Sequence, residues 1–205
     1  MPRINNKTDR KTIDNELLII GCSHTAGVGH KSNETTYPIL FSKMMGIDNP
    51  LVLGLPGQGN MTIESSLTEL SLQNKSVIIQ FSDFFRLQVY DSQLDMVVKK
   101  QSRDYTRNDV VFYTENYLQY EFIKIVNRLV TRFRDANVNF LFFRLSHIHK
   151  NYYQIEKELD NFPEYCSMEH AVVDVALDKM HFGINTHQEL SNRLYNKWTA
   201  LYAQN

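Results

Sequence analysis

An aspartate and a histidine three residues apart, Asp178 and His181, have a spacing that suits proton transfer. A carboxylate at that distance on one loop can accept a hydrogen bond from the imidazole and fix its tautomer. The other ring nitrogen is then available to take a proton from a serine hydroxyl. An Asp-x-x-His motif by itself is weak, because an aspartate there is also favoured simply by the start of a helix. The pair therefore has to be weighed together with a candidate serine.

That serine, Ser23, follows the first apolar run of the chain, residues 17–20. A continuous apolar run predicts a buried strand, and the small polar residues after it predict a tight turn. Gly21 and Gly27, on either side of the serine, permit close backbone approach. Ligands of open α/β sheets bind outside the carboxyl ends of the strands, which is where this turn falls. A turn that only reverses the chain remains an open alternative for this stretch.

The elements that must position these residues alternate between strands and helices. Further strands are predicted at 51–53, 77–81 and 138–143, a short strand or helix at 171–176, and helices at 37–45, from Asn60, at 115–137 and at 187–203. Such alternation is typical of an α/β fold, a parallel sheet covered by helices on both faces. The serine then lies at the first strand-to-helix junction and the Asp-x-x-His pair at the last. Together, these placements are far more specific than either motif.

Residues 84–114 interrupt the alternation. Aromatic and charged residues are mixed there without a clean period, so we expect an irregular insertion, or a lid with a hairpin or a short helix. Residues 1–15 are polar and charged, and they predict a flexible lead-in without an apolar signal segment. Residues 16–205 are then expected to form a single domain, which is long enough to bury a proper core.

On these motifs the chain resembles the SGNH (GDSL-like) hydrolase family along nearly its whole length. Residues 21–25, Gly-Cys-Ser-His-Thr, are similar to the first family block, with Cys22 where the family has an aspartate. Residues 54–57, Gly-Leu-Pro-Gly, are similar to the second block, and residues 178–181 are similar to the fifth. The resemblance therefore covers the blocks that supply the family's nucleophile, one oxyanion donor and the acid–base pair.

The third family block, usually Gly-x-Asn-Asp, falls on residues 80–83 and departs from the pattern. Ser82 stands where the family's asparagine completes the oxyanion hole. Three outcomes are open at this position: the Ser82 hydroxyl substitutes, the Asn60 side chain reaches in, or the activity is intrinsically low. Loss of one oxyanion donor costs about 100- to 1000-fold in turnover in other enzymes.

The resemblance implies a flavodoxin-like three-layer α/β/α sandwich with a parallel sheet of about five strands. It also implies a catalytic triad in which Ser23 attacks an ester carbonyl, His181 transfers the proton and Asp178 orients the imidazole. The backbone N–H groups of Ser23 and Gly57 would hold the oxyanion. This chemistry uses neither a cofactor nor a metal.

The function so implied is a serine esterase that acts on O-acyl groups. A small acyl group, such as acetyl on a carbohydrate, is the expected substrate, and His24 and Thr25 are expected to line the pocket. An acyltransferase with the same triad remains an alternative, as does a non-catalytic binding or structural protein on the same scaffold. The departures at Cys22 and Ser82 motivate the non-catalytic alternative.

Composition excludes several other classes. A formal net charge of -1 gives no general attraction to nucleic acid, and no apolar run approaches the roughly 18 residues of a membrane span. The two cysteines are too few for a disulfide framework, so we expect a soluble, cytoplasmic protein. His147 and His149 match no established zinc spacing, and no metal site is expected. The oligomeric state is not indicated.

Overall fold

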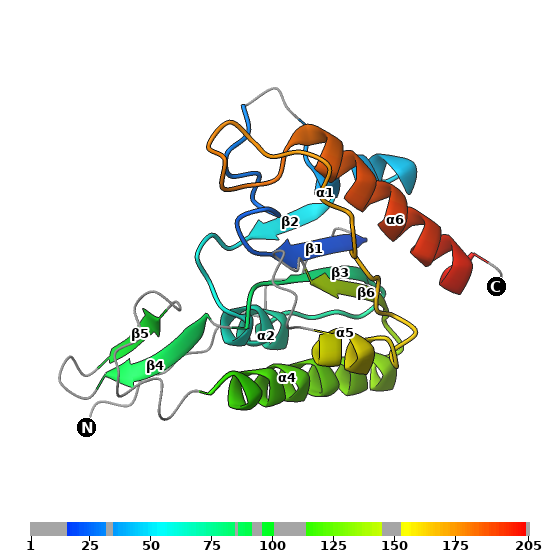
Figure 1. Ribbon diagram of the computed structural model, residues 1–205. Coiled ribbons are helices and arrows are strands. Elements are labelled where there is room, and N and C mark those ends of the chain that lie inside the picture. Colours follow the sequence, from blue (N-terminus) through cyan, green and yellow to red (C-terminus); the bar gives the residue numbers. More distant parts are fainter. Residues whose placement is uncertain are drawn as a thin grey trace, which may run out of the picture.

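The computed structural model describes residues 16–31, 35–84, 86–91, 96–100, 114–144 and 153–203. Figure 1 shows a central sheet with helices on either side of it. The predicted lead-in, residues 1–15, lies outside the described residues, and so do His147 and His149.

Four parallel strands form the central sheet in the order β2-β1-β3-β6. Their bounds are Leu17–Gly21 for β1, Leu51–Gly54 for β2, Ser76–Phe81 for β3 and Asn139–Arg144 for β6. In register, Ile19 of β1 lies between Val52 of β2 and Ile78 of β3. Every residue of β1 is buried, which explains why a continuous apolar run rather than an alternating one encodes it.

Helices cover both faces of the sheet and complete two separate cores. They are α1 (Tyr37–Met44), α2 (Asn60–Glu69), α4 (Glu115–Asp135), α5 (Tyr153–Leu159) and α6 (Ile184–Tyr202). Leu18 and Ile20 of β1 pack with α2, α4 and α5, whereas Leu17 and Ile19 pack with α1 and α6. Figure 1 shows the same division, and the expected three-layer α/β/α sandwich is confirmed. None of these helices is long and apolar enough to cross a membrane.

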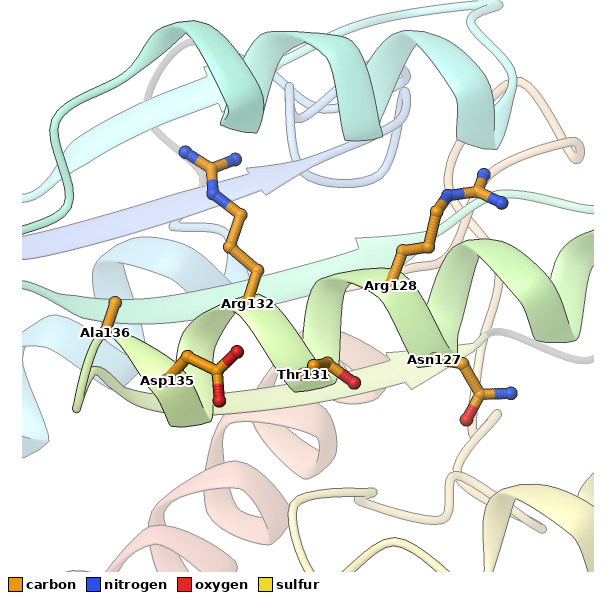
Figure 2. Close-up of a pocket in the computed structure, with 6 residues that line it drawn as sticks. All are labelled: Asn127, Arg128, Thr131, Arg132, Asp135 and Ala136. Carbon is orange, nitrogen blue, oxygen red and sulfur yellow. The ribbon is translucent and has the colours of Figure 1, made fainter.

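Two arginines of α4 fasten that helix to α2. Arg128 donates from Nε and Nη2 to the carboxylate of Glu64, at 2.6 and 2.8 Å. Arg132 donates to the carbonyl oxygens of Leu67 and Thr68, at 3.0 and 3.3 Å. Figure 2 shows both arginine side chains pointing toward α2. Both guanidinium groups therefore already use part of their hydrogen-bonding capacity within the protein.

The sheet has four strands within the described residues, and one residue marks a fifth position. Tyr165 forms a single parallel bridge beside Phe142 of β6. Phe142 N donates to Glu164 O at 3.1 Å, and Cys166 N donates to Phe142 O at 2.9 Å. The chain therefore touches the edge of the sheet once and leaves it, close to the expected count of about five strands.

Residues 171–176 form neither the expected short strand nor a helix. Their one bridge is antiparallel, between Val175 and Phe182. The backbone N–H groups of Val173 and Asp174 both donate to Thr186 Oγ1, each at 2.9 Å. This stretch therefore forms hydrogen bonds with the start of α6 and does not join the sheet.

Residues 84–114 were expected to form an irregular insertion, or a lid with a hairpin or a short helix, and the structure describes two regular strands there. They are β4 (Leu87–Asp91) and β5 (Met96–Lys100), which pair in antiparallel fashion as a separate sheet. In Figure 1 this small sheet projects from the main body beside the start of α4. This antiparallel pair agrees with the hairpin alternative, but the lack of a clean apolar period left the positions of its strands undetermined in the sequence.

Candidate active site

The turn after β1 presents Ser23 at the carboxyl edge of the sheet. Val28 N donates to Ser23 O at 3.0 Å, so the chain closes tightly around the serine. A Cβ added to Gly21 would lie 2.2 Å from Thr25 Oγ1, so a glycine is needed where the turn folds back on β1. The serine itself is 6% exposed. A tight turn at the carboxyl end of a strand is a position at which enzymes present a nucleophilic serine, but the Ser23 side chain is almost fully covered here.

A buried set of hydrogen bonds holds this turn from β3 and α1. Gln80 accepts from Thr25 N at 3.1 Å through Oε1 and donates to Cys22 Sγ at 3.1 Å through Nε2. The Thr25 hydroxyl donates to Gln80 Oε1 and lies 2.7 Å from the Tyr37 hydroxyl. The structure thus places Thr25, which was expected to line the pocket, in a buried anchor of the turn. Gln80 was missed by the sequence analysis, because nothing in its local pattern marks a residue that contacts another strand.

Asp178 and His181 lie together on the loop before α6. His181 Nδ1 and Asp178 Oδ2 are 2.6 Å apart. The other carboxylate oxygen accepts the backbone N–H groups of Met180 at 2.9 Å and His181 at 3.0 Å. The Met180 N–H, followed by the His181 side chain, lowers the pKa of Asp178 to about 2, so the carboxylate is ionised at neutral pH. The proton is thereby favoured on Nδ1, which leaves Nε2 as the acceptor.

His24 joins the serine turn to this loop. Its ring stacks on that of Phe182 with centroids 4.2 Å apart, and it meets the His181 ring edge-on at 5.1 Å. Phe182 N also donates to His24 Nδ1 at 3.5 Å. His24 is 5% exposed. This expected pocket residue therefore packs against the loop of Asp178 and His181 and is largely covered.

The Ser23 hydroxyl itself is directed to a neighbour on its own turn. Its hydrogen bond goes to Cys22 Sγ at 3.9 Å, and within the described residues none joins Ser23 to His181. Asp178 and His181 are therefore hydrogen-bonded to each other, while Ser23 is not hydrogen-bonded to either of them. Catalytic hydrogen bonds in unliganded enzymes are often long and tighten only when substrate binds.

The glycine turn after β2 lies against the serine turn. Leu55 N donates to Gly21 O at 2.8 Å, and a Cβ added to Gly54 would lie 2.3 Å from the Cα of Ala26. Gly57 follows with a φ of +72°, and a Cβ there would meet nothing within 4 Å. The Gly57 backbone is thus in a conformation that suits glycine and is not covered by neighbouring side chains.

Asn60 and Ser82, the two candidates for the missing oxyanion donor, bind each other. Asn60 Oδ1 accepts from Ser82 N at 2.8 Å and from Ser82 Oγ at 3.1 Å, while Asn60 Nδ2 donates to Ser82 O at 3.1 Å. Ser82 has one hydroxyl proton, which it already donates in a hydrogen bond to Asn60 Oδ1. The asparagine amide has two N–H bonds, so one remains available. Of the two side chains, Asn60 keeps a spare donor.

Comparisons with known proteins place the fold. No protein-family model matches the chain, and no curated protein matches it. Solved structures do match. A protein assigned to the G-D-S-L lipolytic family from Desulfitobacterium hafniense DCB-2 has a TM-score of 0.59 and 12% identity, over 89% of this chain and 99% of that one.

Two further structures match over similar lengths. The acetylxylan esterase Axe2 of Geobacillus stearothermophilus has a TM-score of 0.57 and 16% identity, over 92% of this chain and 96% of the esterase. The enzyme LAE5, an alpha/beta hydrolase from the metagenome of Lake Arreo, has a TM-score of 0.55 and 15% identity, over 93% and 97%.

Variants of Axe2 have also been solved as catalytic mutants. They replace a serine, an aspartate or a histidine by alanine, and the aspartate precedes the histidine by three positions. At these identities the similarity concerns the fold. The chain thus has the α/β/α fold of the G-D-S-L lipolytic protein and of the acetylxylan esterase, as the sequence resemblance predicted.

Proposed function

We propose that this protein is a serine esterase that hydrolyses O-acyl esters through Ser23, His181 and Asp178. The observation that carries the proposal is the preformed pair of Asp178 and His181, joined at 2.6 Å on a loop that contacts the serine turn. The same three residue types are altered in the Axe2 catalytic mutants, with the same spacing between aspartate and histidine.

In this mechanism, Ser23 Oγ attacks the ester carbonyl carbon while its proton passes to His181 Nε2. The tetrahedral intermediate collapses, the C–O bond to the alcohol breaks, and His181 gives the proton to the departing oxygen. A water molecule then gives a proton to His181 and attacks the acyl carbon. The bond to Ser23 Oγ breaks as His181 returns the proton to that oxygen, and the acid is released. Asp178 keeps the imidazole oriented and stabilises the imidazolium that forms in each half-reaction.

The oxyanion is held by the backbone N–H groups of Ser23 and Gly57 and by the second N–H of Asn60. Ser82 acts through Asn60, because its backbone and hydroxyl fix the asparagine amide. A donor of this kind contributes about 100- to 1000-fold to turnover. The departure in the third family block is then compensated by a side chain from the start of α2.

The proposed substrate is a small acyl ester, with acetyl on a carbohydrate as the favoured case. Ser23 is almost wholly buried, which favours a small acyl group over a long one. Axe2, which is named an acetylxylan esterase, supports the carbohydrate assignment as an analogy of fold.

The test is the intact mass of the protein after incubation with a fluorophosphonate. We expect one adduct on the wild type, none on Ser23→Ala, and slower formation on His181→Ala. An aryl acetate then measures turnover in the same three proteins, with Ser23→Ala as the background.

A non-catalytic protein on this scaffold is the second candidate, and the Ser23–Cys22 contact favours it. It predicts a folded wild type without an adduct and without turnover of the aryl acetate above the Ser23→Ala background. These two results together would refute the esterase proposal and support the non-catalytic protein.

A further inference from the structure

A second feature of the same sheet edge is a pocket of about 240 Å³ between the start of α2 and the first half of α4. Apolar side chains make up much of its wall, among them Phe84, Leu118 and Phe122. Asn60 also lines the pocket, which therefore adjoins the proposed oxyanion hole. A cavity of this size accepts a small chemical group rather than a whole oligosaccharide.

Arg86 brings to this pocket a guanidinium nitrogen that has no hydrogen-bond partner. It lines the pocket, and its Nη1 is buried without a hydrogen-bond partner. A buried N–H without an acceptor is costly, and for a charged group the cost is larger. The backbone of Arg86 lies directly against Gly59, since a Cβ added to Gly59 would be 2.3 Å from Arg86 O.

The other described charges of the pocket wall are already paired. Arg128 holds Glu64 through two hydrogen bonds, at 2.6 and 2.8 Å. Glu121 accepts from Lys124 at 2.9 Å. Among the described lining residues, Arg86 is thus the cation whose hydrogen-bonding capacity calls for an anionic ligand.

We propose that this pocket binds a carboxylate of the substrate through Arg86, so that the preferred substrates are esters that carry a carboxylate group. A guanidinium presents parallel N–H donors that match a carboxylate, and the apolar wall strengthens their interaction. This inference rests on the proposed esterase function. The carboxylate can belong to the acyl group, as in a hemisuccinate, or to the alcohol, as in an acetylated uronic acid.

The kinetic test compares matched neutral and carboxylated esters. On the acyl side the pair is 4-nitrophenyl acetate and 4-nitrophenyl hemisuccinate. On the alcohol side it is an O-acetylated methyl glucoside and the corresponding methyl glucuronoside. We expect the kcat/KM ratio of carboxylated to neutral ester to fall about 10- to 100-fold in Arg86→Gln for one of the pairs. Arg86→Lys, which keeps the charge but loses the fork, should recover part of the ratio.

Arg132→Gln is the matched control. It removes a guanidinium of α4 that does not line this pocket and already donates to Leu67 O and Thr68 O. Its ratios should equal those of the wild type. An unchanged ratio in Arg86→Gln for both pairs, or an equal fall in Arg132→Gln, would overturn the assignment of the carboxylate site.

A binding measurement separates this inference from the proposed function. Glucuronate and succinate are titrated into the folded Ser23→Ala protein by NMR, with glucose as the neutral comparison. Carboxylate binding that Arg86→Gln abolishes supports the site even if no ester is turned over. Turnover of neutral esters without Arg86-dependent carboxylate binding or preference would leave the esterase and refute the carboxylate site.

Discussion

Gly29 lies directly against the carboxylate of Asp178. A Cβ added at Gly29 would be 2.7 Å from Asp178 Oδ2, the oxygen that meets His181. Gly29 also has a φ of +89°, which favours glycine. The loop after the serine turn therefore packs against the proposed acid–base pair, although Gly29 and Asp178 are far apart in the sequence.

Replacing Gly29 by alanine should displace the Asp178 carboxylate and lower kcat for an aryl acetate by about 10- to 100-fold. Gly46→Ala is the matched control, since Gly46 has a φ of +71° but a Cβ there meets nothing within 4 Å. Both variants should lose about 1–3 kcal/mol of unfolding free energy from backbone strain. Equal activity in the two would show that contact with Asp178 does not matter.

The oxyanion assignment predicts unequal effects at Asn60 and Ser82. Asn60→Asp keeps an acceptor for the Ser82 N–H but has no amide N–H to donate, so kcat should fall about 100- to 1000-fold. Ser82→Ala removes a hydroxyl that binds only within the protein, and its kcat should stay within about tenfold of the wild type. Steady-state kinetics and thermal midpoints of both variants check this. A larger loss in Ser82→Ala would assign the donor to the serine.

The low pKa of Asp178 predicts a pH dependence of stability. Hydrogen bonds from Met180 N, and then from the His181 side chain, lower that pKa from 3.8 to about 2. The folded state therefore favours the ionised carboxylate, and this stabilisation is present above about pH 4 and lost as the pH falls toward 2. The urea midpoint of the wild type should drop over this range more steeply than that of Asp178→Asn. Parallel curves would show that the carboxylate is not held in this way.

A second pH dependence of stability is expected from His187, which is buried on α6. Its Nδ1 accepts from Tyr37 N at 3.0 Å, and its Nε2 has no hydrogen-bond partner. Burial, followed by the nearby His30, lowers its pKa from 6.5 to about 4. Because the unfolded chain takes up the proton first, stability should fall by about 3 kcal/mol between roughly pH 6.5 and 4, and then level off.

His187→Gln, which does not titrate, isolates this effect. Its unfolding free energy should change less between pH 7 and 4 than that of the wild type, whatever its absolute stability. The measurement is urea unfolding at intervals across this range. A wild-type profile as flat as that of the variant would mean that the buried imidazole takes up its proton equally well in the folded state.

Much of the fold is predictable because the sheet is parallel and buried. The apolar run at 17–20 corresponds to β1, observed as Leu17–Gly21, since a strand covered on both faces needs apolar residues at every position. The segment at 171–176 shows the limit of this reasoning. Its apolar residues resemble a strand, but the backbone N–H groups of Val173 and Asp174 donate to Thr186 at the start of α6.

The candidate site also has one part that the sequence predicts and another part that it does not. Asp178 and His181 are close because their spacing places them in one turn, which is a local property of the sequence. The contacts of Gln80 with the serine turn, and of Asn60 with Ser82, join separate elements across the sheet edge. No local pattern encodes such contacts, because they depend on strand order and register.

The loop that carries Asp178 and His181 is closed on itself. Ala176 N donates to His181 O at 2.7 Å, and Gly183 N donates to Asp174 O at 3.0 Å. The hydrogen bonds of the proposed acid–base pair are thus made by neighbours in the chain, whereas the turn of Ser23 is held by a distant strand. A graft of residues 174–183 onto another strand-to-helix junction would keep these hydrogen bonds, but it would also need a residue without a side chain at the place of Gly29 and partners for Phe182 such as His24 and His30.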